Sequence, residues 1–90
     1  MTAANIPRLT RGCRLSEDPG QGWVLLIPEG VLRLSGPGPR ILRLCDGAHT
    51  FGDIVLALGA EFAGSDVALV EAETAAFLDR LIARHVVVLE

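Results

Sequence analysis

The 90-residue sequence has no lysine, no tyrosine, two histidines and two cysteines. The absence of lysine excludes Schiff-base chemistry, and the absence of tyrosine excludes a phenolic acid catalyst. Cys13 and Cys45 are too far apart in sequence to form a CxxC pair, and a structural zinc site needs four clustered ligands. We therefore expect no metal and no cofactor, and we expect both cysteines to be small buried apolar residues.

Long apolar runs are also missing. Runs such as residues 24–27 and 86–89 are short, whereas a membrane-spanning helix needs about 20 apolar residues. The first seven residues lack the basic start and apolar core of a signal peptide. We expect a soluble, cytoplasmic protein that does not contact membranes. With 50% apolar residues, the chain is too hydrophobic for disorder, which predicts one domain over residues 1–90 with residues 1–10 as a flexible arm.

The first part of the chain has the pattern of β-strands. Residues 12–16, 23–27 and 31–35 each have strand length, and the middle segment is apolar enough to be a central strand covered on both faces. In the third segment, Leu32 and Leu34 alternate with residues that face the other way. Short connections rich in glycine and proline favour an antiparallel three-stranded meander.

Helical signals follow. Pro39 suits the first turn of a short helix that ends near Cys45, and Thr50 with Asp53 resembles a capping box for a second helix. Ser65 or Asp66 can cap a third, longer helix. The second helix has apolar residues at helical spacing, namely Phe51, Ile54, Val55, Leu58 and Phe62, and the third has Val67, Val70, Thr74, Phe77, Leu78, Leu81 and Ile82. Three strands followed by three helices predict an α+β, winged-helix-like domain, which closes with a short extended segment at residues 85–89.

Signs of catalysis are scarce. His49 and His85 are isolated, and no Ser–His–Asp or Cys–His arrangement can be assembled, so we do not expect an enzyme. A winged-helix DNA-binding regulator is an alternative function. However, the second and third helices carry six acids against Arg80 and Arg84, and these acids would repel a phosphate backbone. We therefore expect no nucleic-acid partner.

The open edge of the predicted sheet offers a different function. An exposed edge strand is a template for an added strand, and peptides are recognised in this way through main-chain hydrogen bonds. Residues 86–89 or a second copy of the chain, as a homodimer, could instead cover this edge. Periodicity alone does not separate these possibilities.

Three segments carry a resemblance to a known family. They are RLTRGCRL at residues 8–15, WVLLIPEGV at 23–31 and ILRLCDG at 41–47. Together with Thr50, Ile54 and the long third helix, they resemble the PqqD family over nearly the whole chain. Each segment alone is a weak signal, and the combination is fairly specific.

The resemblance implies a small protein of pyrroloquinoline quinone (PQQ) biosynthesis. Such a protein binds the ribosomal precursor peptide PqqA and presents it to the radical S-adenosylmethionine (SAM) enzyme PqqE, which holds the iron–sulfur chemistry. Recognition of a peptide from a different modified-peptide pathway is a further alternative. In the family, the peptide adds as a strand beside the third strand, in a groove walled by the third helix. The implied peptide-binding residues are Gly30, Val31, Leu32, Arg33 and Leu34 at the edge and Ala76, Asp79, Arg80 and Ala83 on the helix.

Two departures from the family pattern affect the ends of elements. The family commonly has Asn or Asp after the third strand, where this chain has a Gly- and Pro-rich stretch at residues 35–39. It also tends to have Gly near His85, where a residue in the left-handed conformation would end the third helix. The core pattern is intact, and the two departures concern only the helix ends near Gly36 and His85.

Overall fold

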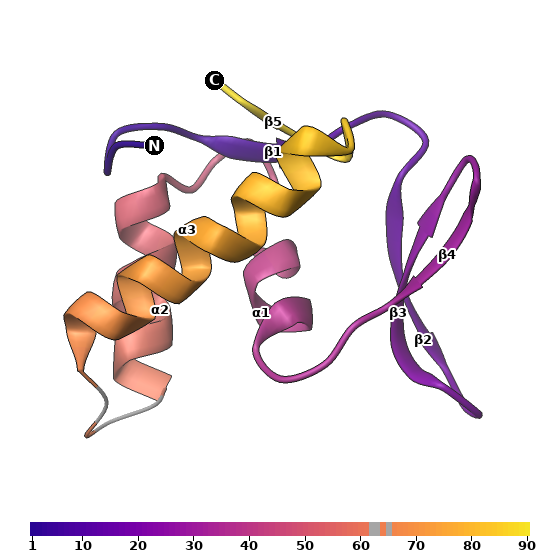
Figure 1. The fold of residues 1–90 in the computed structure, drawn as a ribbon, viewed down its shortest axis with the longest axis horizontal. Helices are drawn as coiled ribbons and strands as arrows, with labels where there is room; N and C mark the ends of the chain where they lie inside the picture. The colour runs from indigo at the N-terminus through magenta and orange to yellow at the C-terminus, as the bar shows by residue number, and fades with distance from the viewer. Residues whose placement is uncertain (62–63, 65) are drawn as a thin grey trace.

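An antiparallel meander organises the first third of the chain. The computed structural model describes residues 1–61, 64 and 66–90. Strands β2 (Arg14–Asp18), β3 (Gly22–Ile27) and β4 (Gly30–Arg33) form a sheet in the order β2-β3-β4, so β3 is central as predicted (Figure 1). Ile27 pairs with Gly30 across a two-residue turn, and Gly30 has a φ of 150°, which favours glycine.

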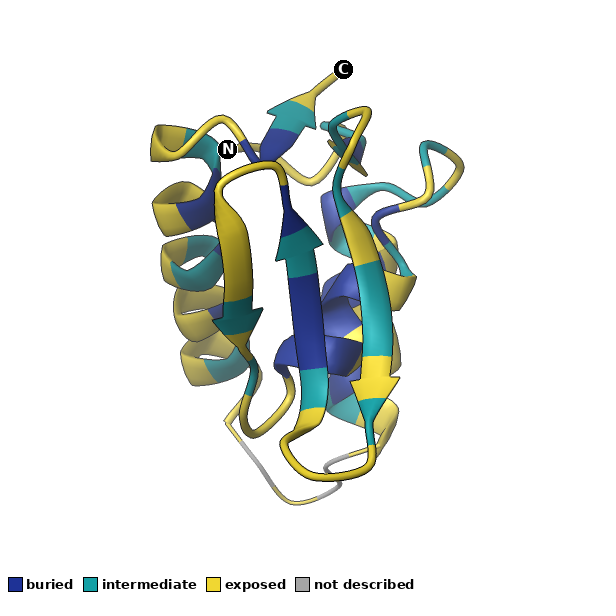
Figure 2. Cartoon of the chain, turned by 90° about the vertical axis from the view of Figure 1, so that its right-hand side faces the viewer, coloured by how far each residue is buried: buried dark blue, intermediate teal, exposed yellow. Residues whose placement is uncertain are grey.

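The sheet packs one face against the helices and turns the other toward solvent (Figure 2). Leu25 pairs with Leu15 on one side and Leu32 on the other, and this row faces the core. Val24 faces the opposite way and is buried, but no helix of the described residues packs on that face (Figure 2), so the expectation of a central strand covered on both faces is not met.

Three helices follow the sheet. They are α1 (Gly38–Arg43), α2 (Phe51–Glu61) and α3 (Val67–Ala83), which agrees with the predicted order. The capping box forms, because the Thr50 N–H donates to Asp53 Oδ2 at 3.0 Å and the Asp53 N–H donates to Thr50 Oγ1 at 3.1 Å. Two predictions, Phe62 in the α2 stripe and Ser65 as a cap, lie outside the described residues.

The third helix begins and ends at identifiable signals. Asp66 caps it by accepting a hydrogen bond from the Ala68 N–H at 2.9 Å. At the other end, the His85 N–H donates to the Ile82 carbonyl and the Val86 N–H donates to the Leu81 carbonyl, which is a Schellman motif. His85 is the left-handed residue of this motif, with a φ of 61°, at the position where the resembled family tends to have Gly.

A second sheet joins the two ends of the chain and was not predicted. Strand β1 (Pro7–Leu9) pairs antiparallel with β5 (Val87–Leu89), so the expectation of a flexible arm over residues 1–10 is not met at residues 7–9 (Figure 1). Pro7 is fully buried in this pairing, and proline in so short a segment gives little strand signal. The C-terminal segment is therefore used far from β4 and does not cover its edge.

One hydrophobic cluster connects the sheet with the helices. Its members come from every layer and are Leu25, Ile27, Ile41, Leu42, Cys45, Phe51, Ile54, Val55, Leu58, Leu78, Leu81, Val86 and Val87. The predicted stripe of α3 lies partly in this cluster, but Val67 at its start is 60% exposed. None of the helices in the described residues combines the length and apolar character needed to cross a membrane.

Polar contacts attach α1 to its neighbours. The Arg43 guanidinium lies over the Trp23 ring, 4.5 Å from its centroid, and joins α1 to β3. Arg40 Nε donates to Glu61 Oε2 at 2.7 Å and joins α1 to the end of α2. These contacts fix α1 below the space between β4 and α3.

Candidate functional site

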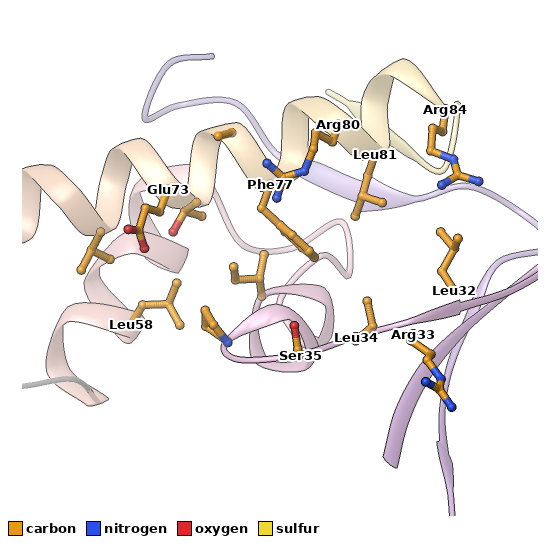
Figure 3. Close-up of a pocket in the computed structure, with 15 residues that line it drawn as sticks. Leu32, Arg33, Leu34, Ser35, Leu58, Glu73, Phe77, Arg80, Leu81 and Arg84 are labelled. Carbon is orange, nitrogen blue, oxygen red and sulfur yellow. The ribbon is translucent and has the colours of Figure 1, made fainter. Parts of the chain in front are cut away.

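A groove of about 770 Å³ runs between β4 and α3 (Figure 3). Its lining is mainly apolar, and α1 and α2 contribute to its floor. The apolar lining residues are Leu32, Leu34, Pro37, Ile41, Leu58, Val70, Ala76, Phe77 and Leu81. The polar ones are Arg33, Ser35, Glu73, Thr74, Arg80 and Arg84.

The edge of β4 that borders the groove has unpaired main-chain groups. The Leu34 N–H donates to the Trp23 carbonyl at 3.0 Å, so Leu34 is bonded toward β3. Hydrogen-bonded and non-bonded pairs alternate along an antiparallel ladder, so Leu32 is also bonded toward β3. Val31 and Arg33 consequently direct their N–H and C=O groups away from β3. Among the described residues, no strand pairs with this edge.

The side chains of β4 divide between two faces as the alternation predicted. Leu32 and Leu34 lie between the strand and α3, whereas the Arg33 side chain points away from the helix (Figure 3). Arg33 Nε donates to Gln21 Oε1 at 3.2 Å, and Val31 is 52% exposed. An added strand beside β4 would therefore meet leucine side chains on its groove face.

The floor of the groove is closely packed where β4 leads into α1. A Cβ atom at Gly38 would lie 3.4 Å from Phe77 Cζ and 3.7 Å from Leu34 Cβ. A Cβ atom here would therefore be in ordinary van der Waals contact with both side chains. Phe77 is half-buried, with one side in the core and the other lining the groove.

The structure brings together five of the nine residues implied by the resemblance. Leu32, Arg33, Leu34, Ala76 and Arg80 line the groove. Gly30 and Val31 lie on β4 beyond the groove, while Asp79 and Ala83 are exposed on α3 and do not line it.

The difference on α3 has a simple geometric cause. Successive residues of a helix are about 100° apart, and Ala76 lies at the boundary of the groove-facing side. Asp79 and Ala83 lie just past that boundary, toward solvent. The α3 side of the groove also includes Val70, Phe77 and Arg84, which were not among the residues implied by the resemblance. Val70 and Phe77 belonged to the predicted apolar stripe of the third helix. The stripe predicts that they are buried, but it does not show that they are only half-buried and line a groove.

The two cysteines differ in environment. Burial raises the pKa of the Cys45 thiol to about 12, and its Sγ donates to the Ile41 carbonyl at 3.3 Å. Cys13 is half-buried, so the expectation that both are buried holds only for Cys45. Asp46 hydrogen-bonds His49 and the Ala48 N–H, and these bonds lower the pKa of the Asp46 carboxyl. No group of three or more His, Cys, Asp or Glu residues in the described ranges could hold a metal ion.

Comparison with known proteins agrees with this architecture. The family model for "Coenzyme PQQ synthesis protein D (PqqD)" matches residues 22–87. The chain belongs to the PqqD family. It is 41% identical over 66 residues to the PqqA binding protein of Azotobacter vinelandii, covering 72% of each chain. It is 37% identical over 76 residues to the PqqA binding protein of Pseudomonas aeruginosa, covering 83% of this chain and 80% of the relative.

A solved structure extends the likeness from sequence to fold. The solution NMR structure of the PqqD truncation of Methylobacterium extorquens PqqCD matches with a TM-score of 0.77 and 35% identity. The match covers 91% of this chain and 87% of that one. That protein is described as a functional, stand-alone recognition element for ribosomally synthesised and post-translationally modified peptides. The α+β fold and the assignment to PQQ biosynthesis, both predicted from the sequence, are confirmed by these matches.

Proposed function

We propose that this PqqD-family chain binds the precursor peptide PqqA as a strand added to β4. The relatives named PqqA binding proteins support the identity of the peptide. The observation that carries the proposal is the open edge of β4, where Val31 and Arg33 direct main-chain groups outward beside an apolar groove. Main-chain bonds to such an edge provide affinity, and the groove accepts alternate side chains of the peptide.

The same geometry supports presentation of PqqA to the radical SAM enzyme PqqE. Side chains of a strand alternate between two faces. Those that do not enter the groove would emerge on the solvent face of the enlarged sheet, beside the exposed Val31 side chain. An enzyme can reach these residues without displacing the peptide from the groove. In this scheme the present chain contributes binding only, with no catalysis or cofactor of its own, and it acts in the cytoplasm, where PqqA is synthesised.

Binding is tested by isothermal titration calorimetry with synthetic PqqA and by amide NMR shifts. We expect a 1:1 complex with the largest shifts at β4 and along the groove face of α3. Shifts confined to α2, or no heat of binding, would contradict strand addition. A titration with duplex DNA under the same conditions tests the regulator alternative, for which we expect no binding.

Presentation is tested with Val31→Asp, which changes the solvent face and leaves the main-chain donor in place. This variant should bind PqqA as the unmodified chain does and should lower the affinity of the PqqA complex for PqqE. A homodimer through β4 is the competing use of the edge. If the chain forms a dimer through β4, sedimentation velocity should show dimers that dissociate when PqqA is added. A dimer that persists with PqqA bound would place the dimer contact elsewhere.

A further inference from the structure

Charged side chains are unevenly distributed along the groove. Arg84 lies toward the end that Leu32 occupies and Arg80 lies beside Phe77 in the middle of the groove, whereas Glu73 lies at the other end, close to Leu58 (Figure 3). The salt bridges found among the described residues use other side chains and leave both arginines unpaired. The groove therefore has a basic end and an acidic end.

The spacing of these charges matches a short strand. Glu73 and Arg84 are eleven residues apart on α3, which corresponds to about 16 Å at the rise of an α-helix. In a strand of five residues the first, third and fifth side chains face the same way, and the first and fifth lie about 13 Å apart. Two groove-facing residues four positions apart would thus lie near Glu73 and between Arg80 and Arg84.

Main-chain hydrogen bonding does not by itself fix how far a peptide slides along β4. A slip of two residues keeps the same side chains on the groove face and restores a ladder of equivalent bonds. Leu32 and Leu34 accept many apolar side chains, so they discriminate weakly between such registers. A charged side chain that is favoured at one end and disfavoured at the other can select a single register.

We propose that Arg80 and Arg84 set the register of the bound strand by pairing with a carboxylate of the peptide. The inference rests on the proposed function, because it concerns the strand that would occupy the same groove. Both arginines are exposed in the unbound chain, and guanidinium groups bind carboxylates through two parallel hydrogen bonds. Glu73 repels a carboxylate at the opposite end, so a slipped strand loses the pair and gains a like-charge contact.

A structural role for the arginines must be separated from this one. Basic residues in the last turn of a helix interact favourably with its dipole, and Arg80 lies in the last turn of α3. A purely structural role would affect stability equally with every peptide. A role in register predicts that the effect depends on one particular carboxylate of the peptide.

The test uses the double variant Arg80→Glu/Arg84→Glu and synthetic PqqA peptides. In the peptide series, each Asp or Glu is replaced in turn by its amide. We expect the double variant to bind unmodified PqqA at least tenfold more weakly, which corresponds to about 1.4 kcal/mol. One amide peptide should bind the unmodified protein with a similar loss, and that loss should disappear in the double variant. The control, Arg11→Glu/Arg14→Glu, makes the same change in net charge at exposed residues outside the groove.

The outcomes separate this inference from the proposed function. If the unmodified chain does not bind PqqA, the proposed function is wrong. If it binds, but Arg80→Glu/Arg84→Glu and its control lose affinity equally, or no amide peptide is coupled to the arginines, the register inference is wrong and strand addition stands. Circular dichroism checks folding. If the charge-reversed variant unfolds, Arg80→Gln/Arg84→Gln is measured with the same peptides. The inference then requires that the affinity loss caused by one amide peptide disappears in this variant.

Discussion

The sharpest test of strand addition is Arg33→Pro. Proline has no N–H, and in an edge strand it is tolerated where the lost donor was not part of the sheet. Arg33 pairs with Val24 at a non-bonded position, so its N–H faces the groove edge and contributes nothing to the β3-β4 ladder. The substitution therefore removes a donor that only an added strand would use.

The magnitude follows from the peptide carbonyl left without a donor. An unsatisfied polar group in a partly buried position costs about 1–3 kcal/mol, which corresponds to a loss of about 5- to 150-fold in affinity. The variant also loses the exposed hydrogen bond from Arg33 to Gln21, so stability should fall by less than about 1 kcal/mol. Calorimetry with synthetic PqqA measures the affinity, and urea unfolding followed by circular dichroism measures the stability.

Two further substitutions act as controls. Arg33→Ala removes the same side chain but keeps the N–H, so it should bind PqqA within about fivefold of the unmodified chain, because an exposed ion pair contributes about 0–1 kcal/mol. Leu32→Pro removes a bond toward β3 and a half-buried leucine, so it should destabilise the fold by about 3 kcal/mol or more. A folded Arg33→Pro protein that binds PqqA as tightly as Arg33→Ala would refute strand addition at β4.

Three other predictions concern the groove wall, a helix end and a thiol. Ala76→Arg should obstruct the groove and weaken PqqA binding more than tenfold by calorimetry, whereas Ala83→Arg, just outside the lining residues, should change it by less than about twofold (about 0.4 kcal/mol). His85→Gly should raise the free energy of unfolding by about 1 kcal/mol, because a side chain in the left-handed conformation costs about 1–2 kcal/mol; an unchanged urea midpoint would contradict this. The pKa of Cys45 is raised from 9.0 to about 12, so the stability contributed by its protonated thiol is fully present below pH 9 and is lost as the pH rises toward 12. At pH 8, iodoacetamide should modify Cys13 in the folded protein and Cys45 only after unfolding, as measured by mass spectrometry. Equal rates of modification of the two cysteines in the folded protein would contradict the burial of Cys45.

Local patterns predicted the elements that border the site. The alternation through β4 placed Leu32 and Leu34 on the core side, because a strand has only two faces and apolar residues occupied one of them. The Thr50–Asp53 capping box and the Asp66 cap were visible because these signals lie within three residues of the helix start. Such features depend on neighbours in sequence, so they do not require knowledge of the fold.

Features that depend on distant parts of the chain were missed. The pairing of Pro7–Leu9 with Val87–Leu89 joins segments about 80 residues apart, and each is only three residues long. The rotation of α3 about its axis was similarly invisible, because a shift of a few tens of degrees moves Ala83 into or out of the groove wall. A helical period identifies the buried stripe but not which of its borders faces a neighbouring strand.

The end of α3 explains why the edge of β4 is available. After the Schellman turn at His85, the chain turns away from β4, and Val86 and Val87 become buried, with β5 then pairing to β1. The apolar segment most able to cover the open edge is therefore already used in the second sheet. The remaining edge is only four residues long and carries the charged Arg33, features that limit pairing between copies of a chain. An edge of this kind favours an extended peptide whose side chains fit the adjacent groove over self-association, because the peptide gains both main-chain bonds and apolar contacts with α3.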